Sequence, residues 1–213
     1  MKQPSSIEII KKKYELKHQK FPDDFPFNIT SLVFTNGNYK SEGRKFIIEQ
    51  LTIEERRIII NFIGPTDILN QFYNDLKSIL LKLDTRSEKG LFNEFVKTNE
   101  TICVVKLDFQ IKDLFINSPM LSFSENIKNS IPGYDCKIDI IPDSIRLKIK
   151  YSSIPDKLSK NKIMITDKDF TIGVRDKTNP DDMIFVTSSP SDSDVHFKLL
   201  TQLENIIKQK KRK

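Results

Sequence analysis

The spacing of hydrophobic and polar positions changes several times along the chain, and each change predicts a different element. Residues 6–19 carry apolar side chains at helical intervals after a Ser-x-x-Glu capping box, which predicts a basic amphipathic helix. Runs rich in β-branched and aromatic residues predict strands at 27–35, 45–53 and 57–63. Asn36-Gly37, directly after the first run, is typical of a hairpin turn.

The first half of the chain ends in a helix with one apolar stripe. The segment 64–67, Gly-Pro-Thr-Asp, stops the preceding strand and caps the helix, because Asp is favourable at the positive N-terminal end. The polar residues 84–99 then indicate a connector between two halves. The stripe positions recur at helical spacing and are Ile68, Leu69, Phe72, Leu76, Ile79, Leu80 and Leu83.

Strands dominate the predicted second half. Strict alternation over 101–111 predicts a strand whose odd-numbered residues, Cys103 among them, share the more apolar face. Asn117-Ser118-Pro119 begins a helix that we expect to end at Pro132-Gly133. Further strands are expected at 136–141, 144–151, 162–166, 170–175 and 183–187.

The segment 189–192 caps a last helix. Its apolar stripe comprises His196, Leu199, Leu200, Leu203, Ile206 and Ile207.

The two halves repeat one order of elements, which suggests an internal duplication. Residues 57–65 and 182–190 are each a strand that runs into a proline-containing cap and a striped helix. Any strand–cap–helix unit needs these features, so a chance similarity stays open. The order of elements over 101–207 resembles the repeat of the TATA-binding-protein fold and, more loosely, the helix-grip fold of lipid-binding proteins. This resemblance includes no sequence motif and implies nothing about function.

The expected fold is therefore α+β. We predict a largely antiparallel sheet of about eight strands, with helices packed on one face and an internal pseudo-repeat. The expected segments are a basic N-terminal helix (1–20), a first half (27–83), a connector (84–99), a second half (100–207) and a basic tail (208–213).

Composition narrows the class of protein. The 213 residues are 38% hydrophobic and 30% charged, which fits a folded domain and excludes general disorder. No apolar run reaches the roughly 18–20 residues of a membrane span, and the N-terminus does not resemble a secretory signal. Two cysteines cannot form a disulfide framework. We therefore expect an intracellular protein, cytoplasmic or, in a eukaryote, nuclear.

The positive charge lies at the two ends of the chain. The formal net charge is +6, of which residues 1–20 carry +4 and residues 208–213 carry +5, so residues 21–207 carry −3. The chain has no alanine and no tryptophan but much Ile, Lys and Asn, which indicates an AT-rich coding sequence. A high lysine content is then weak support for a nucleic-acid partner.

The residues that common catalytic chemistries need are scarce. The two histidines, His18 and His196, fall in predicted helices, where a packed or partly exposed ring is the simpler interpretation. Cys103 and Cys136 form no Cys-x-x-Cys pair, so the sequence does not show the four closely spaced ligands of a structural zinc site. Six glycines form no phosphate-binding loop. The acidic pairs lie in predicted turns and caps; a two-metal site built from them stays an alternative. We expect no catalytic residue, metal or cofactor.

One predicted strand carries a row of cations. Arg146, Lys148 and Lys150 would share one face of the strand 144–151, about 6–7 Å apart. This spacing suits a nucleic-acid backbone, but a solvated face that deters edge pairing explains it as well. The further candidate binding residues are Lys137 and Lys106, if their strands neighbour this one, and Lys210, Lys211, Arg212 and Lys213 of the tail.

These observations favour a non-catalytic interaction module. We expect an intracellular adaptor or assembly subunit that binds another macromolecule, most simply a protein, through a free sheet face and basic ends. A nucleic-acid-binding protein that uses the basic strand face is the alternative, and a carrier of an apolar ligand is a further one. We expect no membrane partner, and the sequence leaves the oligomeric state open.

Overall fold

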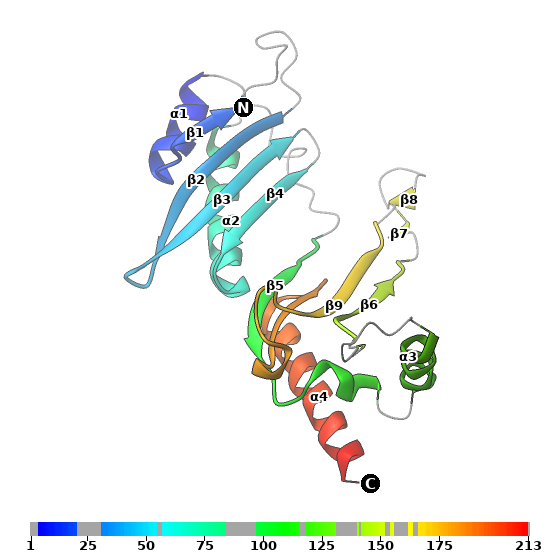
Figure 1. Ribbon diagram of the computed structural model, residues 1–213. Coiled ribbons are helices and arrows are strands. Elements are labelled where there is room, and N and C mark those ends of the chain that lie inside the picture. The colour runs from blue at the N-terminus through cyan, green and yellow to red at the C-terminus, as the bar shows by residue number, and fades with distance from the viewer. Residues whose placement is uncertain are drawn as a thin grey trace. The chain divides into compact units, whose positions relative to one another are not determined.

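Two compact units, residues 1–94 and 95–213, make up the chain in the computed structural model (Figure 1). Each unit has a four-stranded antiparallel sheet with a long helix packed against it, which confirms the α+β class. The predicted strands thus form separate sheets and not one sheet of about eight. The structure describes residues 4–20, 31–54, 57–83, 97–115, 118–130, 140, 142–151, 154–155, 162–163 and 166–212.

Unit 1 has the sheet order β1-β2-β3-β4, with every neighbouring pair antiparallel. Its elements are α1 (Pro4–Lys13), β1 (His18–Lys20), β2 (Ser31–Ser41), β3 (Arg44–Glu54), β4 (Ile58–Ile63) and α2 (Thr66–Leu83). The predicted strands 45–53 and 57–63 are therefore confirmed within one residue at each end.

The core of unit 1 lies between α2 and the sheet. Phe72, Leu76 and Leu80 of α2 are completely buried, as the predicted stripe requires, and pack with Phe34 and Leu51 of the strands. Helix α1 adds further side chains to the same core. The basic N-terminal helix is thus part of the folded unit and not a free arm.

Asn36-Gly37 does not form the hairpin turn that we predicted. Both residues lie within β2, and the turn is at Glu42-Gly43, where both φ angles are positive (51° and 73°). Asn36 also has a positive φ, 55°. Thr35 pairs with Gln50 and Gly37 pairs with Ile48, so Asn36 and Glu49 are left out of the pairing of β2 with β3. An Asn-Gly pair suits a positive φ in a bulge as well as in a turn, which explains the error.

This irregularity changes which residues of β2 face the core. Leu32 and Phe34 are buried before it, whereas Gly37 and Tyr39 face the core after it. The buried residues of β3 shift in the same way, from Ile48 to Leu51.

Helix α1 is shorter than the predicted helix 6–19. It ends at Lys13, and Glu15 has φ 52°, a left-handed conformation that ends helices. The chain then lies close against β2, where the N–H of Asn38 donates a hydrogen bond to the carbonyl oxygen of Tyr14 at 2.7 Å. At Gly37 a Cβ atom would overlap the side chain of Leu16, so a larger residue here would force the buried Leu16 side chain to shift.

Unit 2 has the sheet order β5-β10-β9-β6, again all antiparallel. Its first elements are β5 (Thr101–Lys106), η1 (Ile111–Phe115), α3 (Pro119–Ser130) and β6 (Ser144–Ile149). They are followed by the short pair β7 (Ile154–Pro155) and β8 (Lys162–Ile163), then β9 (Lys168–Val174), η2 (Pro180–Asp182), β10 (Ile184–Ser189) and α4 (Ser193–Lys211).

The predicted strand 101–111 is too long by five residues. The strand ends at Lys106, and the chain turns into η1, where the Asp113 carboxylate accepts the N–H of Gln110 at 2.8 Å. The predicted division into two faces is confirmed within β5, where Ile102, Val104 and Lys106 are exposed and the residues between them are half-buried, and the same alternation continues after the strand with Leu107, Phe109 and Ile111 buried. The predicted strand 136–141, with Cys136 and Lys137, lies outside the described residues except for residue 140.

Helix α4 buries only half of its predicted stripe. His196, Leu200 and Ile207 are at most 3% exposed, and Leu203 is partly buried against the same core. Leu199 is 38% exposed and Ile206 is 52% exposed. The buried residues follow the i, i+4, i+7, i+11 pattern, whereas Leu199 and Ile206 each lie about 100° around the helix, beyond the contact with the sheet.

Candidate functional site

The predicted row of cations does lie along one strand, but an acid interrupts it. Arg146 and Lys148 lie on β6 and Lys150 directly follows it, and all three are exposed. Asp169 of the neighbouring β9 is paired in register with Lys148, and its Oδ2 atom lies 3.1 Å from Nε of Arg146. Its Oδ1 atom is buried without a hydrogen-bond partner in the described part of the chain. A bound phosphate would therefore meet a carboxylate between the cations.

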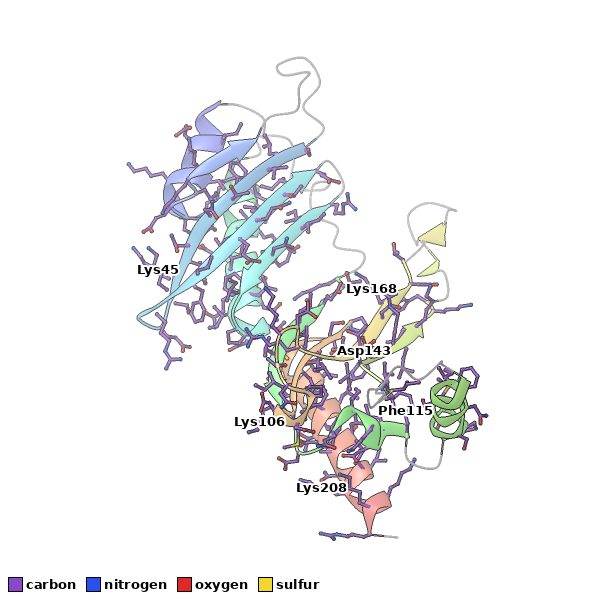
Figure 2. The ribbon with its side chains drawn as sticks, viewed as in Figure 1. Lys45, Lys106, Phe115, Asp143, Lys168 and Lys208 are labelled. Carbon is purple, nitrogen blue, oxygen red and sulfur yellow. The ribbon has the colours of Figure 1, made fainter. Side chains whose placement is uncertain are left out.

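Lys106 does not extend this row. It lies on β5, the edge strand opposite β6, with β10 and β9 between them. Arg146 is in register with Thr171, which is paired through β10 with Ile102, four residues before Lys106. Three strand spacings and four residues separate the two cations by about 20 Å. Lys168, which pairs with Ile149 at the end of β6, lies at the other end of the sheet from Lys106 (Figure 2). The condition that the strands be neighbours is not met for Lys106.

The predicted basic tail is mostly the last turn of α4. Nζ of Lys208 lies 2.9 Å from Asp108, and Nζ of Lys211 lies 2.5 Å from Asp113. These ion pairs attach the end of the helix to the segment that follows β5. Lys210 and Arg212 are exposed, and Lys213 lies outside the described residues. Part of the positive charge that the sequence places at this end is thus neutralised locally.

The structure brings Cys103 and His196 together, which sequence reasoning missed. The Cys103 sulfur lies 3.2 Å from Nε2 of His196, and the Thr187 hydroxyl lies 2.9 Å from the same nitrogen. The Ser189 hydroxyl lies 2.7 Å from Nδ1. Cys103 and His196 are 93 positions apart, and the pairing of β5 with β10 together with the packing of α4 against this sheet places them side by side.

This cluster has the contacts of a structural network. The His196 ring is completely buried, and burial lowers its pKa, so the ring is neutral near neutral pH. Each ring nitrogen already has a hydroxyl partner, Thr187 at Nε2 and Ser189 at Nδ1. The network fixes the first turn of α4 against β10 and β5. Our interpretation of His196 as a packed histidine is confirmed, whereas the helical placement of His18 is wrong, since it begins β1.

A polar hollow of about 380 Å³ lies in unit 1 where α1, β2 and α2 meet. Its charges are paired: Lys13 with Asp75 at 2.7 Å, and Lys40 with Glu15 at 2.8 Å. Hydrogen bonds from Lys40 and Lys45 lower the pKa of Glu15 to about 2. The hollow is therefore a site where ion pairs attach α1 to the unit, and its lining does not favour an apolar ligand. The lining residues are Lys13, Tyr14, Glu15, Asn38, Tyr39, Lys40 and Asp75.

The edge strand β5 presents a row of exposed aliphatic side chains. Ile102 is 68% exposed and Val104 is 53% exposed, both on the sheet face that α4 does not cover. Val186 of β10 is paired with Val104 and is 37% exposed, so the apolar row continues onto the next strand. Ile102 is the most exposed large hydrophobic side chain in the described part of the chain.

Other kinds of site find no support among the described residues. No group of three or more His, Cys, Asp and Glu side chains is placed there to hold a metal ion. None of the described helices is both long enough and apolar enough to cross a membrane. Comparison of the chain with known protein families, curated proteins and solved structures gave no match.

Proposed function

We propose that the protein is a non-catalytic interaction module that binds another protein through the edge strand β5 of its second sheet. One observation carries the proposal: an edge strand with two strongly exposed β-branched side chains, Ile102 and Val104, whose outer face α4 does not cover. An edge of this kind can accept a further strand from a partner, because the partner's backbone completes the ladder and its side chains cover the apolar row.

The edge strands β6 and β4 are less suitable. The edge β6 carries Arg146 and Lys148, and charges on an edge discourage pairing with another strand. The edge β4 of unit 1 exposes Ile59 and Ile63, but Asn61 lies between them on the same face. The edge β5 has no charged residue between Glu100 and Lys106.

Binding of nucleic acid to the basic face of β6 is the second candidate function. It is favoured by the exposure of Arg146, Lys148 and Lys150, and weakened by Asp169 beside them. It predicts that affinity falls steeply as salt is raised. It also predicts that replacement of the three cations by Ser weakens binding more than deletion of 208–213.

The two functions are separated by affinity capture of partners from the native host with the full chain. The variants are Val104→Lys on β5 and, as a matched control, Ile63→Lys on β4, because both side chains are 53% exposed. The triple Ser variant of the cations on and after β6 is the third bait, and each capture is repeated after nuclease treatment. We expect the captured proteins to be lost with Val104→Lys and retained with Ile63→Lys, with the triple variant and after nuclease.

Two results would contradict the proposal. If captured material disappears after nuclease and with the triple Ser variant, the nucleic-acid function takes its place. If Val104→Lys and Ile63→Lys capture the same proteins, β5 is not the docking surface. Circular dichroism of each variant checks that the chain is still folded.

A further inference from the structure

We propose that the strand which completes the β5 edge is β5 of a second copy of this chain, paired antiparallel across a two-fold axis at Cys103. The inference rests on the proposed use of β5 as a docking surface and names its occupant.

The backbone groups that face the free edge belong to the even-numbered residues of β5. The N–H of Leu107 donates to the carbonyl oxygen of Met183 at 3.1 Å, which directs the odd-numbered residues toward β10. Successive residues of a strand direct their N–H and C=O groups to opposite sides. Ile102, Val104 and Lys106 therefore offer theirs to a new strand, and the same residues carry the exposed side chains of the outer face.

Self-pairing is then limited to a few registers. Residues that face each other in an antiparallel pair must have side chains on the same face of the sheet. A two-fold axis that meets this condition places one residue directly opposite the same residue of the second copy. Near the centre of β5 this residue can be Ile102, Cys103 or Val104. Each choice places different residues opposite each other.

Charge complementarity selects the axis at Cys103. This register places Glu100 opposite Lys106 of the second copy, and by symmetry Lys106 opposite Glu100, while Ile102 and Val104 face each other twice. An axis at Val104 would instead place Glu100 opposite Asp108, two like charges. An axis at Ile102 would leave Glu100 opposite Val104. Glu100 uses Oε2 for Lys168, and a carboxylate has a second oxygen for a second cation.

The inner face of the edge also fits a second copy. Phe197 is 48% exposed and lies on the flank of α4 that also carries Glu204 and Lys208, seven and eleven residues later. Those two residues contact Asp108, just after β5, so this flank faces the free edge. The axis brings two such flanks and two Cys103 side chains together below the joined strands. Both faces of the proposed junction are thus apolar at the centre and charged at the ends.

The first test uses Cys103 as a reporter in the full chain with Cys136→Ser, where it is the only thiol. Directly opposed residues have Cα atoms about 4.5–5.5 Å apart, within the range of a disulfide. Diamide, which takes up the two thiol hydrogens and is itself reduced, should give a covalent dimer that a reductant reverses.

The matched controls carry a single thiol in a different register position. In a Cys103→Ser, Cys136→Ser chain, Ile102→Cys and Val104→Cys each stand about 8–9 Å from their own copy, too far for a disulfide. Neither should cross-link alone beyond the background of random collisions, and a mixture of the two should form the heterodimer. Equal cross-linking of Ile102→Cys alone would overturn the register.

The second test exchanges the end charges. Glu100→Lys and Lys106→Glu each place like charges opposite each other twice, and sedimentation equilibrium should show the dimer dissociation constant raised roughly tenfold or more. The double exchange Glu100→Lys with Lys106→Glu restores opposite pairs and should restore the dimer. A weakened dimer in the double exchange would overturn the proposed pairing.

A monomer at every soluble concentration, without cross-linking at Cys103, would overturn the second copy as occupant. In that case the capture comparison of Val104→Lys with Ile63→Lys still decides the proposed function. Loss of captured proteins with Val104→Lys alone would then show that β5 binds a different protein. Equal capture by both would show that β5 binds neither.

Discussion

Protonation of His196 is expected to destabilise unit 2 in mildly acidic solution. The ring is completely buried, and both nitrogens have hydroxyl partners, Thr187 and Ser189. Burial lowers the pKa of His196 below its ordinary value because the charged form would lose its hydration. A histidine with a lowered pKa in the folded state stabilises the fold fully above its unfolded pKa of about 6.5. This contribution is lost as the pH falls below 6.5 toward the folded-state pKa.

The size of the effect follows from the uptake of one proton. The free energy of unfolding can fall by at most about 1.4 kcal/mol for each pH unit in this window. Measurements between pH 7.5 and 5.5 avoid most of the carboxylate titration, because ordinary Asp and Glu side chains have pKa values near 4. Urea unfolding followed by circular dichroism measures the free energy, and hydrogen exchange of the peptides of α4 shows that unit 2 is the part affected.

The chain has two histidines, which gives a matched control. His18→Gln should keep the full pH dependence of unit 2. His196→Gln should lower stability at pH 7.5 and flatten its dependence on pH. A wild-type protein whose unit 2 is equally stable at pH 7.5 and 5.5, or a dependence that disappears with His18→Gln, would refute this reasoning.

Three further predictions concern the packing and the ion pairs. Gly37→Ala should lower the free energy of unfolding of unit 1 by about 1–3 kcal/mol, because the new Cβ atom would overlap the Leu16 side chain. Gly43→Ala, which meets no atom within 4 Å, should cost only the strain of its positive φ, so equal losses would contradict the close approach we describe. Glu15→Gln should destabilise unit 1 at pH 7, because the hydrogen-bonded ion pairs with Lys40 and Lys45 stabilise the ionised form of Glu15 and so lower its pKa to about 2. The difference in stability from wild type should shrink as the pH falls from about 4.5 to about 2 and Glu15 is protonated. A difference in urea midpoint that does not change with pH would argue against it. Deletion of 208–213 should speed hydrogen exchange in the last turns of α4, since two ion pairs to Asp108 and Asp113 are lost; unchanged exchange there would mean that these pairs do not hold the helix end.

Local signals predicted the elements with long and regular patterns. The stripe of α2 and the strand β4 were found because their burial follows one period over a whole element. Asp192 was found as the cap of α4 because a carboxylate at that position accepts the N–H of Val195. These features depend on residues close together in the sequence.

The errors arose where two structures satisfy the same local preference. Asn36-Gly37 suits a hairpin turn or an irregular strand, and only the pairing of β2 with β3 decides between them. Glu15 ends α1 in a left-handed conformation that a glutamate seldom adopts, so no residue type marked this end.

The candidate surface depends on pairing between distant segments. The sequence shows that Ile102 and Val104 share a face, but β5 is an edge only because β10, some eighty residues later, is its single neighbour among the described strands. The contact of Cys103 with His196 has the same origin. The number and exposure of cations, in contrast, could be predicted, although the position of Asp169 among them could not.

Asn36 and Glu49 lie opposite each other as one surplus residue on each arm of the β2–β3 hairpin. Removal of either one alone would move the side chains between that position and the turn to the opposite face of the sheet on one arm only. Removal of both would return the arms to strict alternation and leave the same side chains facing α2. Length changes in relatives of this chain should therefore come in pairs at these two positions, one residue from each arm.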